Sequence, residues 1–295
     1  MSSNGVKADA VAHTNKKVVK VGLCMWIASK LGIVLMLCGA LVCSSVTASE
    51  QKIPDSIKMR KVALIIDDFG NNMRGTEEIL NLPIPLTIAV MPFLPSTKKD
   101  AEMAHQKKHD VIVHMPMEPM KGAKSWLGPG ALMSNLSDEE IRNRVNKAID
   151  DVPHAIGMNN HMGSKVTQNP RIMRIVLQVC KERGLFYIDS KTSYRSIVGQ
   201  IARDLQVPYI ENMVFLDDVH TSSHITKQLR LISEKVKQNE VCIAIGHVGP
   251  GGKKVAQAIH NYLPQLQKEA MIMQVSRMVK EKQATPTKTD KGMKN

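Results

Sequence analysis

Short apolar runs alternate with amphipathic stretches along the chain from about residue 61 to residue 279. Apolar runs of about four to eight residues are typical of strands that are buried on both faces of a sheet. The sequence predicts such strands at 62–67, 85–92, 110–118, 155–164, 185–190, 212–218, 241–248 and 272–279. Stretches with helical periodicity separate them, at 75–82, 96–108, 137–152, 169–184, 196–206, 224–238 and 255–269.

This alternation predicts an α/β fold with a parallel sheet and right-handed crossover connections. About seven strands, or eight with the last one, fit a distorted (β/α) barrel better than a small open sheet, which stays the alternative. Local signals support the helix boundaries. Ser137 and Glu140 form a capping-box pattern at the start of one helix. Pro170 and Gly184 bracket the next helix, at its first turn and after its last turn.

The N-terminal 48 residues have the pattern of an export signal. A basic stretch precedes the apolar segment 21–43, which only Lys30 and a serine interrupt. Its most apolar part, residues 31–43, is short for a membrane span and is followed by small residues suited to cleavage. We expect residues 1–48 to be a signal peptide, with an uncleaved membrane anchor as the alternative. Either would make the protein periplasmic or secreted, or tether it to the inner membrane.

The flanks carry much of the positive charge. The formal net charge is +13, of which residues 1–60 hold +5 and residues 280–295 hold +3. The domain between them has no arginine-rich stripe with interleaved aromatic residues, so we expect no nucleic-acid partner. We interpret residues 49–60 as a linker, residues 61–279 as the domain and residues 280–295 as a disordered basic tail. The sequence does not indicate an oligomeric state.

Two cysteines lie in the body of the domain. Cys180 and Cys242 both sit in apolar runs, which favours free thiols in the core. A disulfide between them is the alternative if the domain is exported. No cysteine and histidine spacing typical of a structural zinc site occurs.

Acids, amides and imidazoles follow the predicted strands. Ligands of parallel α/β folds collect outside the carboxyl ends of the strands, so these polar groups are candidates for a site. They are Asp67 and Asp68, His114 and Glu118, Asn159 to His161, Asp189 and Ser190, Asp217 and Asp218, and His247.

A catalytic zinc site needs three protein ligands and one open position. Asp68, His114 and His161 supply this set, while Asp67 is the candidate general base and His247 the candidate general acid. Together they predict metal-assisted hydrolysis of an acyl group. Each residue also has an ordinary structural role open to it: two adjacent aspartates often cap a helix or form a turn, and a histidine in an apolar run is often a hydrogen-bonded core residue.

Five sequence segments together resemble the divergent polysaccharide deacetylases, relatives of the NodB-type carbohydrate deacetylases. They are IIDDFG at 65–70, HMPME at 114–118, GMNNHMGS at 157–164, FLDD at 215–218 and AIGHVGP at 244–250. The resemblance covers about residues 60–278. It implies a distorted (β/α) barrel that removes acetyl groups from N- or O-acetylated sugars with the help of a metal, which we expect to be zinc or another divalent cation.

By this resemblance Asp67 matches the catalytic base, Asp68 the metal-binding aspartate and His247 the late acid. His114 and His161 are the expected metal imidazoles. We expect Glu118, Asn160, Asp189, Ser190 and Asp217 to contact the substrate or to orient the metal ligands and catalytic residues.

The chain departs from the NodB pattern in two places. It has no H-[ST]-x-x-H segment, so its histidines come from two separate loops, and it has no Arg-Pro-Pro-type loop. The first hypothesis is therefore a metal-dependent deacetylase of an acetylated cell-envelope polysaccharide. The alternative is a catalytically degenerate deacetylase fold that binds carbohydrate or organises the envelope. A two-metal phosphoesterase is disfavoured because further Asp/His clusters are absent from the sequence.

Overall fold

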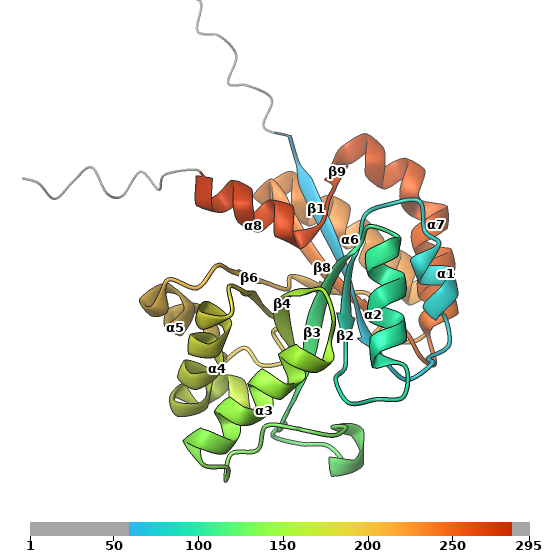
Figure 1. The fold of residues 1–295 in the computed structure, drawn as a ribbon. Coiled ribbons are helices and arrows are strands. Elements are labelled where there is room, and N and C mark those ends of the chain that lie inside the picture. Colours follow the sequence, from blue (N-terminus) through green and yellow to red (C-terminus); the bar gives the residue numbers. More distant parts are fainter. Residues whose placement is uncertain (1–58, 285–295) are drawn as a thin grey trace, which may run out of the picture. The chain divides into compact units, whose positions relative to one another are not determined.

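A computed structural model of the chain describes residues 59–284 (Figure 1). The strands are β1 (Lys61–Phe69), β2 (Thr87–Val90), β3 (Asp110–Met117), β4 (Ala155–Met162), β5 (Phe186–Asp189), β6 (Tyr209–Glu211), β7 (Val214–Phe215), β8 (Val241–His247) and β9 (Met271–Ile272). The α-helices are α1 (Thr76–Leu80), α2 (Thr97–Gln106), α3 (Asp138–Asp151), α4 (Pro170–Glu182), α5 (Val198–Leu205), α6 (Ser222–Asn239), α7 (Gly252–Glu269) and α8 (Val275–Ala284). Short 3-10 turns, η1 and η2, lie at Lys124–Trp126 and Val166–Gln168.

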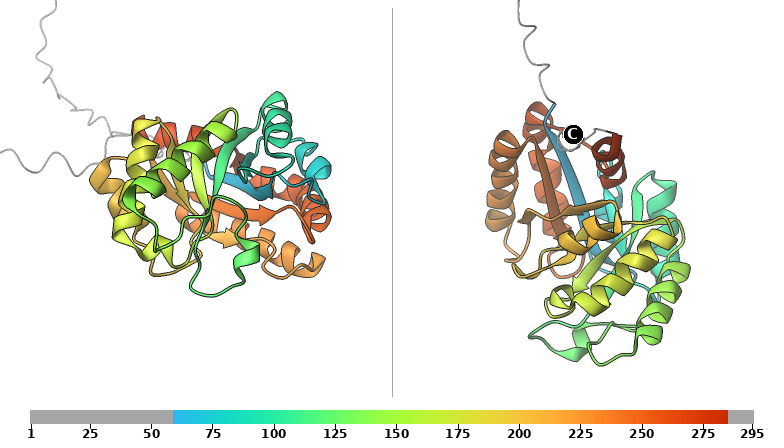
Figure 2. Two further views of the ribbon diagram at one scale, coloured as in Figure 1. Left: turned by 60° about the horizontal axis from the view of Figure 1, so that its bottom comes forward. Right: turned by 90° about the vertical axis from the view of Figure 1, so that its left-hand side faces the viewer.

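All pairings between these strands are parallel, and the sheet curls into a distorted barrel (Figure 2). The strand order is β6-β5-β4-β3-β2-β1-β8-β7, with β9 beside β1. Strands β6 and β7 follow each other along the chain, yet they lie at opposite ends of this order. The curled sheet therefore has a seam between them, where no strand pairing closes the barrel in the described residues.

The core has two parts because strand side chains alternate between the faces of the sheet. Val62, Leu64 and Ile66 of β1 pack in the cluster that lies between the sheet and the surrounding helices. Ala63 and Ile65 point the other way, into a second cluster inside the barrel. Both faces are buried, which explains why the strands have continuous apolar sequences.

The predicted fold class is confirmed, and most helix boundaries lie within two residues of the prediction. Ser137 caps α3 as predicted, with its hydroxyl accepting a hydrogen bond from the Glu140 backbone N–H. Residues 59–284 contain nine strands, and one of them, the three-residue strand β6, was not predicted. Cys180 and Cys242 are buried free thiols, so the expectation of core thiols is confirmed.

The prediction for the C-terminal segment was wrong. Residues 272–279 were expected to form a strand, but only Met271–Ile272 is extended and α8 follows. Val275, Met278 and Val279 are buried, which is the spacing of one helix face and not of a strand. Helix α8 also extends to Ala284, so residues 280–284 of the expected tail are helical.

Other expectations fall on parts of the chain outside the described residues. These are the signal peptide or anchor at 1–48, most of the linker at 49–60 and the end of the tail at 285–295. Within residues 59–284, none of the helices combines the length and the apolar character needed to cross a membrane.

Candidate metal centre

An irregularity at the end of β1 turns two neighbouring carboxylates toward the same site. Strand side chains normally alternate, so Asp67 and Asp68 would point to opposite faces. Asp68, however, has a left-handed backbone with φ of 71°, and the pairing of β1 with β2 slips between Ile66 and Phe69. Such a conformation is costly for a residue with a side chain and is often found at functional sites.

His114 lies on β3, where Asn159 of β4 is its partner across the two strands. Its Nδ1 is 2.6 Å from the side-chain oxygen of Asn159, while the Asn159 amide donates to Oδ1 of Asp67 at 2.9 Å. The oxygen of Asn159 can only accept, so Nδ1 of His114 carries the proton. The unprotonated Nε2 of His114 then faces Asp68.

His161 follows on β4, and its protonation is fixed in the same way. Its Nε2 lies 3.0 Å from the backbone carbonyl oxygen of Trp126, which is an acceptor. The Nε2–H group therefore donates to that oxygen, and Nδ1 is left with a free lone pair. Metal-binding histidines usually hold their second ring nitrogen in such a hydrogen bond.

Three ligand atoms converge at this point. Oδ1 of Asp68 lies 3.2 Å from Nε2 of His114 and 3.0 Å from Nδ1 of His161, and the two nitrogens are 3.1 Å apart. A tetrahedral zinc ion with bonds of about 2 Å separates its ligand atoms by about 3.3 Å. Oδ1 of Asp68 is also buried without a hydrogen-bond partner among the described residues. A divalent cation fits this cluster. Without one, three atoms with free lone pairs would face one another with no hydrogen between them.

The charge balance of the cluster also favours a cation. Burial opposes the charge of Asp68, but without a metal, protonated imidazoles of His114 and His161 that face it hold its pKa well below the usual range. Burial likewise opposes protonation of His114, yet Asp67 and Asp68 raise the pKa of this imidazole. The surroundings therefore stabilise positive charge between these side chains.

Asp67 lies next to the three ligand atoms, but its carboxylate is farther from His114 than the other two ligand atoms are. Its Oδ2 is 3.7 Å from Nε2 of His114. Burial raises the pKa of its carboxyl group, against the opposing influence of His114 and His247. A buried carboxylate with a raised pKa is a suitable proton acceptor.

His247 stands at the end of β8, opposite Asp67 in the strand pairing. Asp217 accepts two hydrogen bonds from it, one from Nδ1 at 2.8 Å and one from the backbone N–H at 3.1 Å. Burial disfavours the charged imidazole, but Asp217 and the nearby Asp68 raise the pKa of His247 to about 9. His247 is therefore protonated on both ring nitrogens at neutral pH. Because Nδ1 bonds to Asp217, Nε2 of His247 faces away from Asp217.

The remaining predicted site residues form hydrogen bonds that hold loops in place. Glu118 accepts hydrogen bonds from the Ser134 backbone and from Lys165, both at 2.7 Å, and its pKa falls to about 2, although partial desolvation opposes the shift. It thus anchors the loop that joins β3 to α3. These contacts are structural and do not reach the three ligand atoms.

A second group of hydrogen bonds holds a loop in place beside β4 and β5. Asn160 accepts from the Ser190 backbone at 3.1 Å, and the Ser190 hydroxyl donates to the Asn160 carbonyl at 2.9 Å. Asp189 accepts from the Ser196 hydroxyl at 2.6 Å and from the Lys191 backbone at 2.8 Å. These bonds hold the loop after β5 against the end of the strand that carries His161.

Two groups that orient the metal-site histidines, the Asn159 side chain and the Trp126 carbonyl, were not predicted from the sequence. Asn159 was noticed only as a residue near a strand end, and its position directly across the sheet from His114 depends on strand register. The Trp126 contact uses a backbone carbonyl from an irregular segment, for which the sequence carries no side-chain signal.

Comparisons with known proteins agree with this architecture. A curled parallel sheet with carboxylates and imidazoles at the carboxyl ends of its strands defines a NodB-like deacetylase fold. The chain belongs to the divergent polysaccharide deacetylase family, whose model matches residues 64–279.

Two relatives and one solved structure illustrate the similarity. The chain is 32% identical over 210 residues to an uncharacterized protein of Haemophilus influenzae, covering 71% of this chain and 74% of the relative. It is 34% identical over 204 residues to the uncharacterized protein YibQ of Escherichia coli (strain K12), covering 69% of this chain and 63% of that protein. The crystal structure of uncharacterized protein ATU2773 from Agrobacterium tumefaciens C58 has a TM-score of 0.69 at 20% identity, over 75% of this chain and 89% of that one. That likeness supports the fold.

Proposed function

We propose that this protein is a metal-dependent deacetylase that acts on an acetylated polysaccharide of the cell envelope. The observation that carries the proposal is the convergence of Asp68, His114 and His161, with both histidines held so that their free nitrogens face the carboxylate. Family membership supports the reaction class. A periplasmic location is proposed from the sequence of residues 1–48 alone.

The chemistry follows from the surrounding residues. Zinc or another divalent cation held by Asp68, His114 and His161 would polarise the acyl oxygen and lower the pKa of water. Asp67 would take a proton from the attacking water, since burial raises the pKa of its carboxyl and Asn159 keeps one of its oxygens in place. His247 would give a proton to the departing sugar nitrogen or oxygen, and Asp217 would hold its ring in position.

Exposed aromatic side chains on loops bonded to the end of β4 support a sugar polymer as the substrate. The indole of Trp126 is 66% exposed and the ring of Tyr194 is 85% exposed, in a protein with few aromatic residues. The Trp126 carbonyl contacts His161, and the hydroxyl of Thr192 donates to the carbonyl of Met162, the residue after His161. Both rings thus come from loops fastened to the end of β4, and flat aromatic faces suit the apolar faces of sugar rings.

A metal and activity assay on the full-length protein tests the proposal. Zinc content is measured in wild type, His114→Ala and His161→Ala, with His260→Ala on the exposed surface of α7 as the matched control. Acetate release is measured with chitin oligosaccharides for N-acetyl groups and with acetylated xylan for O-acetyl groups. We expect loss of metal in the first two variants, and in Asp67→Asn a loss of turnover of about 100-fold or more with metal retained.

The outcomes separate the two hypotheses. Metal that stays bound in both His114→Ala and His161→Ala would exclude this metal centre. Stoichiometric metal with no acetate released from any glycan, and full cellular function in Asp67→Asn, would instead favour the catalytically degenerate, carbohydrate-binding alternative.

A further inference from the structure

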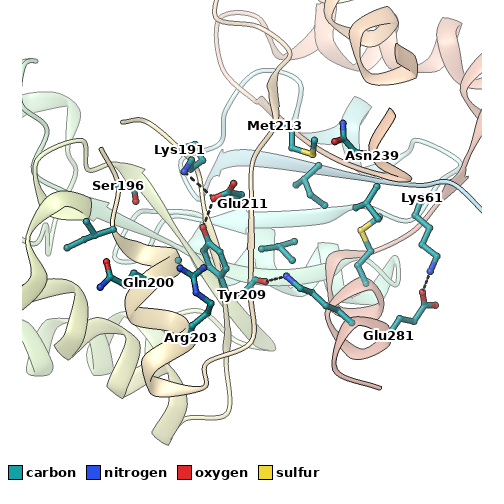
Figure 3. A pocket seen from close by; sticks show the side chains of 17 residues that line it. Lys61, Lys191, Ser196, Gln200, Arg203, Tyr209, Glu211, Met213, Asn239 and Glu281 are labelled. Atoms are coloured by element: carbon teal, nitrogen blue, oxygen red, sulfur yellow. Dashed lines mark hydrogen bonds and ion pairs between the residues drawn. The ribbon is translucent and has the colours of Figure 1, made fainter. Parts of the chain in front are cut away.

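A hollow of about 760 Å³ lies at the seam of the barrel, separate from the candidate metal centre (Figure 3). Its walls come from α5, β6, the start of β8 and α8. The three ligand residues, Asp67 and His247 are not among the residues that line it. Its size is within the range of about 300–1,000 Å³ that is common for small-molecule sites.

The sheet topology explains why this hollow exists. In the described residues β6 pairs only with β5, and β7 pairs only with Ala244 and Ile245 of β8. On the seam side, Val241 and Cys242 have no strand beside them in the described residues, and the Ile243 carbonyl accepts one hydrogen bond, from the Met213 backbone N–H at 3.0 Å. Side chains therefore cover the interior of the barrel beside Val241 and Cys242.

The floor of the hollow is apolar. Ile243 and Met278 belong to the cluster inside the barrel, and Ile210 packs against that cluster. Met213 adds a second flexible thioether side chain, and such side chains adapt their shape to a ligand. Val241 is 37% exposed at the mouth, which leaves an apolar surface open to solvent.

The rim carries an excess of positive charge. Lys61 is paired with Glu281 at 2.6 Å and Lys191 with Glu211 at 3.1 Å (Figure 3). Two further cations, Arg203 of α5 and Lys282 of α8, also line the hollow. Neither forms an ion pair within residues 59–284, and Lys282 donates a hydrogen bond to the backbone carbonyl of Tyr209, at 3.4 Å.

We propose that this seam pocket binds an anionic amphiphile, with its aliphatic chain on the floor of Ile210, Ile243 and Met278 and its head group between Arg203 and Lys282. Apolar burial and charge complementarity point to the same class of ligand. A fatty acid and a phosphorylated lipid share this chemistry. A peptide strand added to the free edges of β6 and β8 is the competing occupant, and it would need no anionic group.

Displacement of a fluorescent fatty acid, 11-(dansylamino)undecanoate, from the full-length protein tests the proposal. Competitors are octanoate, dodecanoate, dodecyl phosphate, dodecyl maltoside and dodecyltrimethylammonium, each below its micelle concentration. We expect the anionic chains to compete, and each added pair of methylene groups to tighten binding by up to about tenfold. The preference between dodecanoate and dodecyl phosphate then identifies the head group.

Charge-reversed variants locate the site. R203E with K282E should weaken dodecanoate binding at least about tenfold, because both head-group contacts are reversed. K227E with R230E, two exposed cations on α6, is the matched control and should bind like wild type. All variants keep residues 1–58, so any binding to that segment is common to them.

Three results would overturn the proposal. Equal losses in the two double variants would indicate general attraction to a basic protein. Equal competition by dodecyl maltoside and dodecanoate would exclude a role for the cations. Displacement by an extended apolar peptide and not by any amphiphile would assign the seam to a strand. Thermal unfolding of each variant shows whether it is folded, and the readout requires neither metal nor hydrolysis.

Discussion

The side-chain oxygen of Asn159 lies 2.6 Å from Nδ1 of His114, and this contact determines which imidazole nitrogen faces Asp68. The amide nitrogen of the same side chain holds Asp67 at 2.9 Å. One buried carboxamide therefore orients both a candidate metal ligand and the candidate base. Because an amide presents a fixed donor and a fixed acceptor, it can satisfy both contacts only with the ring of His114 in this tautomer.

Replacing Asn159 with alanine should weaken metal binding without removing a ligand. The ring of His114 would lose the bond that fixes its orientation, and loss of such partners typically costs about 10–100-fold in metal affinity. Competition between the protein and a chromogenic chelator for zinc measures the change. Asn261→Ala, on the exposed surface of α7, is the control and should match wild type. Unchanged affinity in Asn159→Ala would show that the contact does not orient His114.

The pair formed by His247 and Asp217 should make stability depend on pH. Burial lowers the pKa of His247, but Asp217 and the nearby carboxylates raise it to about 9, above the ordinary histidine value of 6.5. A raised pKa means that the folded state binds the proton more tightly than the unfolded state does. The stabilisation is therefore complete below about pH 6.5 and is lost as the pH rises through about 9.

Asp217→Asn should remove most of this dependence in the metal-free protein. The pKa of His247, followed by NMR, should fall toward 6.5, and the stability difference from wild type should shrink as the pH is raised past 9. Urea unfolding at several pH values measures the second effect. A His247 that titrates identically in both proteins would contradict the assigned hydrogen bond.

Much of the fold and part of the site follow from the sequence because they depend on side-chain patterns. Continuous apolar strands separated by amphipathic helices predict a parallel sheet, and parallel strands bring their carboxyl ends to one edge. This explains why Asp68, His114 and His161, which are far apart in the sequence, lie within hydrogen-bond distance.

The features that were not predicted depend on backbone conformation or on register. The left-handed backbone of Asp68 has no sequence signature, because aspartate adopts this conformation only occasionally. The role of Asn159 requires a strand register that only the folded sheet supplies. Strand β6 is too short for periodicity to reveal, and α8 begins with apolar residues that a short window cannot distinguish from a strand.

Trp126 should contribute to substrate binding through its ring and to the metal centre through its backbone. Trp126→Ala removes an indole that is 66% exposed but keeps the carbonyl that accepts from His161. We expect unchanged zinc content and an increase of about tenfold in KM for a long acetylated glycan, equivalent to the loss of about 1.4 kcal/mol of binding.

Two controls, a small substrate and a substitution on β4, separate the contribution of the ring from that of the carbonyl. Turnover of 4-nitrophenyl acetate, which carries no glycan chain, should be unaffected by Trp126→Ala. Ile156→Ala, at the start of β4 and also exposed, should leave both substrates unaffected. Loss of zinc in Trp126→Ala would mean that the side chain, and not the carbonyl, supports His161.

Two glycines hold α1 against α7, and this contact connects stability to the site. A Cβ atom on Gly75 would lie 2.5 Å from the backbone of Gly252, and one on Gly252 would lie 2.3 Å from the carbonyl oxygen of Arg74. The same region is bonded to the loop after His247, because the Gly249 N–H donates to the Arg74 carbonyl at 2.8 Å. The close approach thus fixes the loop after β8 next to the loop after β1.

Gly75→Ala should therefore destabilise the protein more than an ordinary glycine substitution does. Its φ of 93° is unfavourable for alanine, and its Cβ would also force the two backbones apart, at a combined cost of roughly 2–4 kcal/mol. Gly184 is the matched control, because its φ is 70° but nothing lies within 4 Å of an added Cβ, so only about 1 kcal/mol is expected. Urea unfolding of the two variants measures the difference. Equal losses would indicate that backbone conformation alone explains Gly75 and that the helices separate without cost.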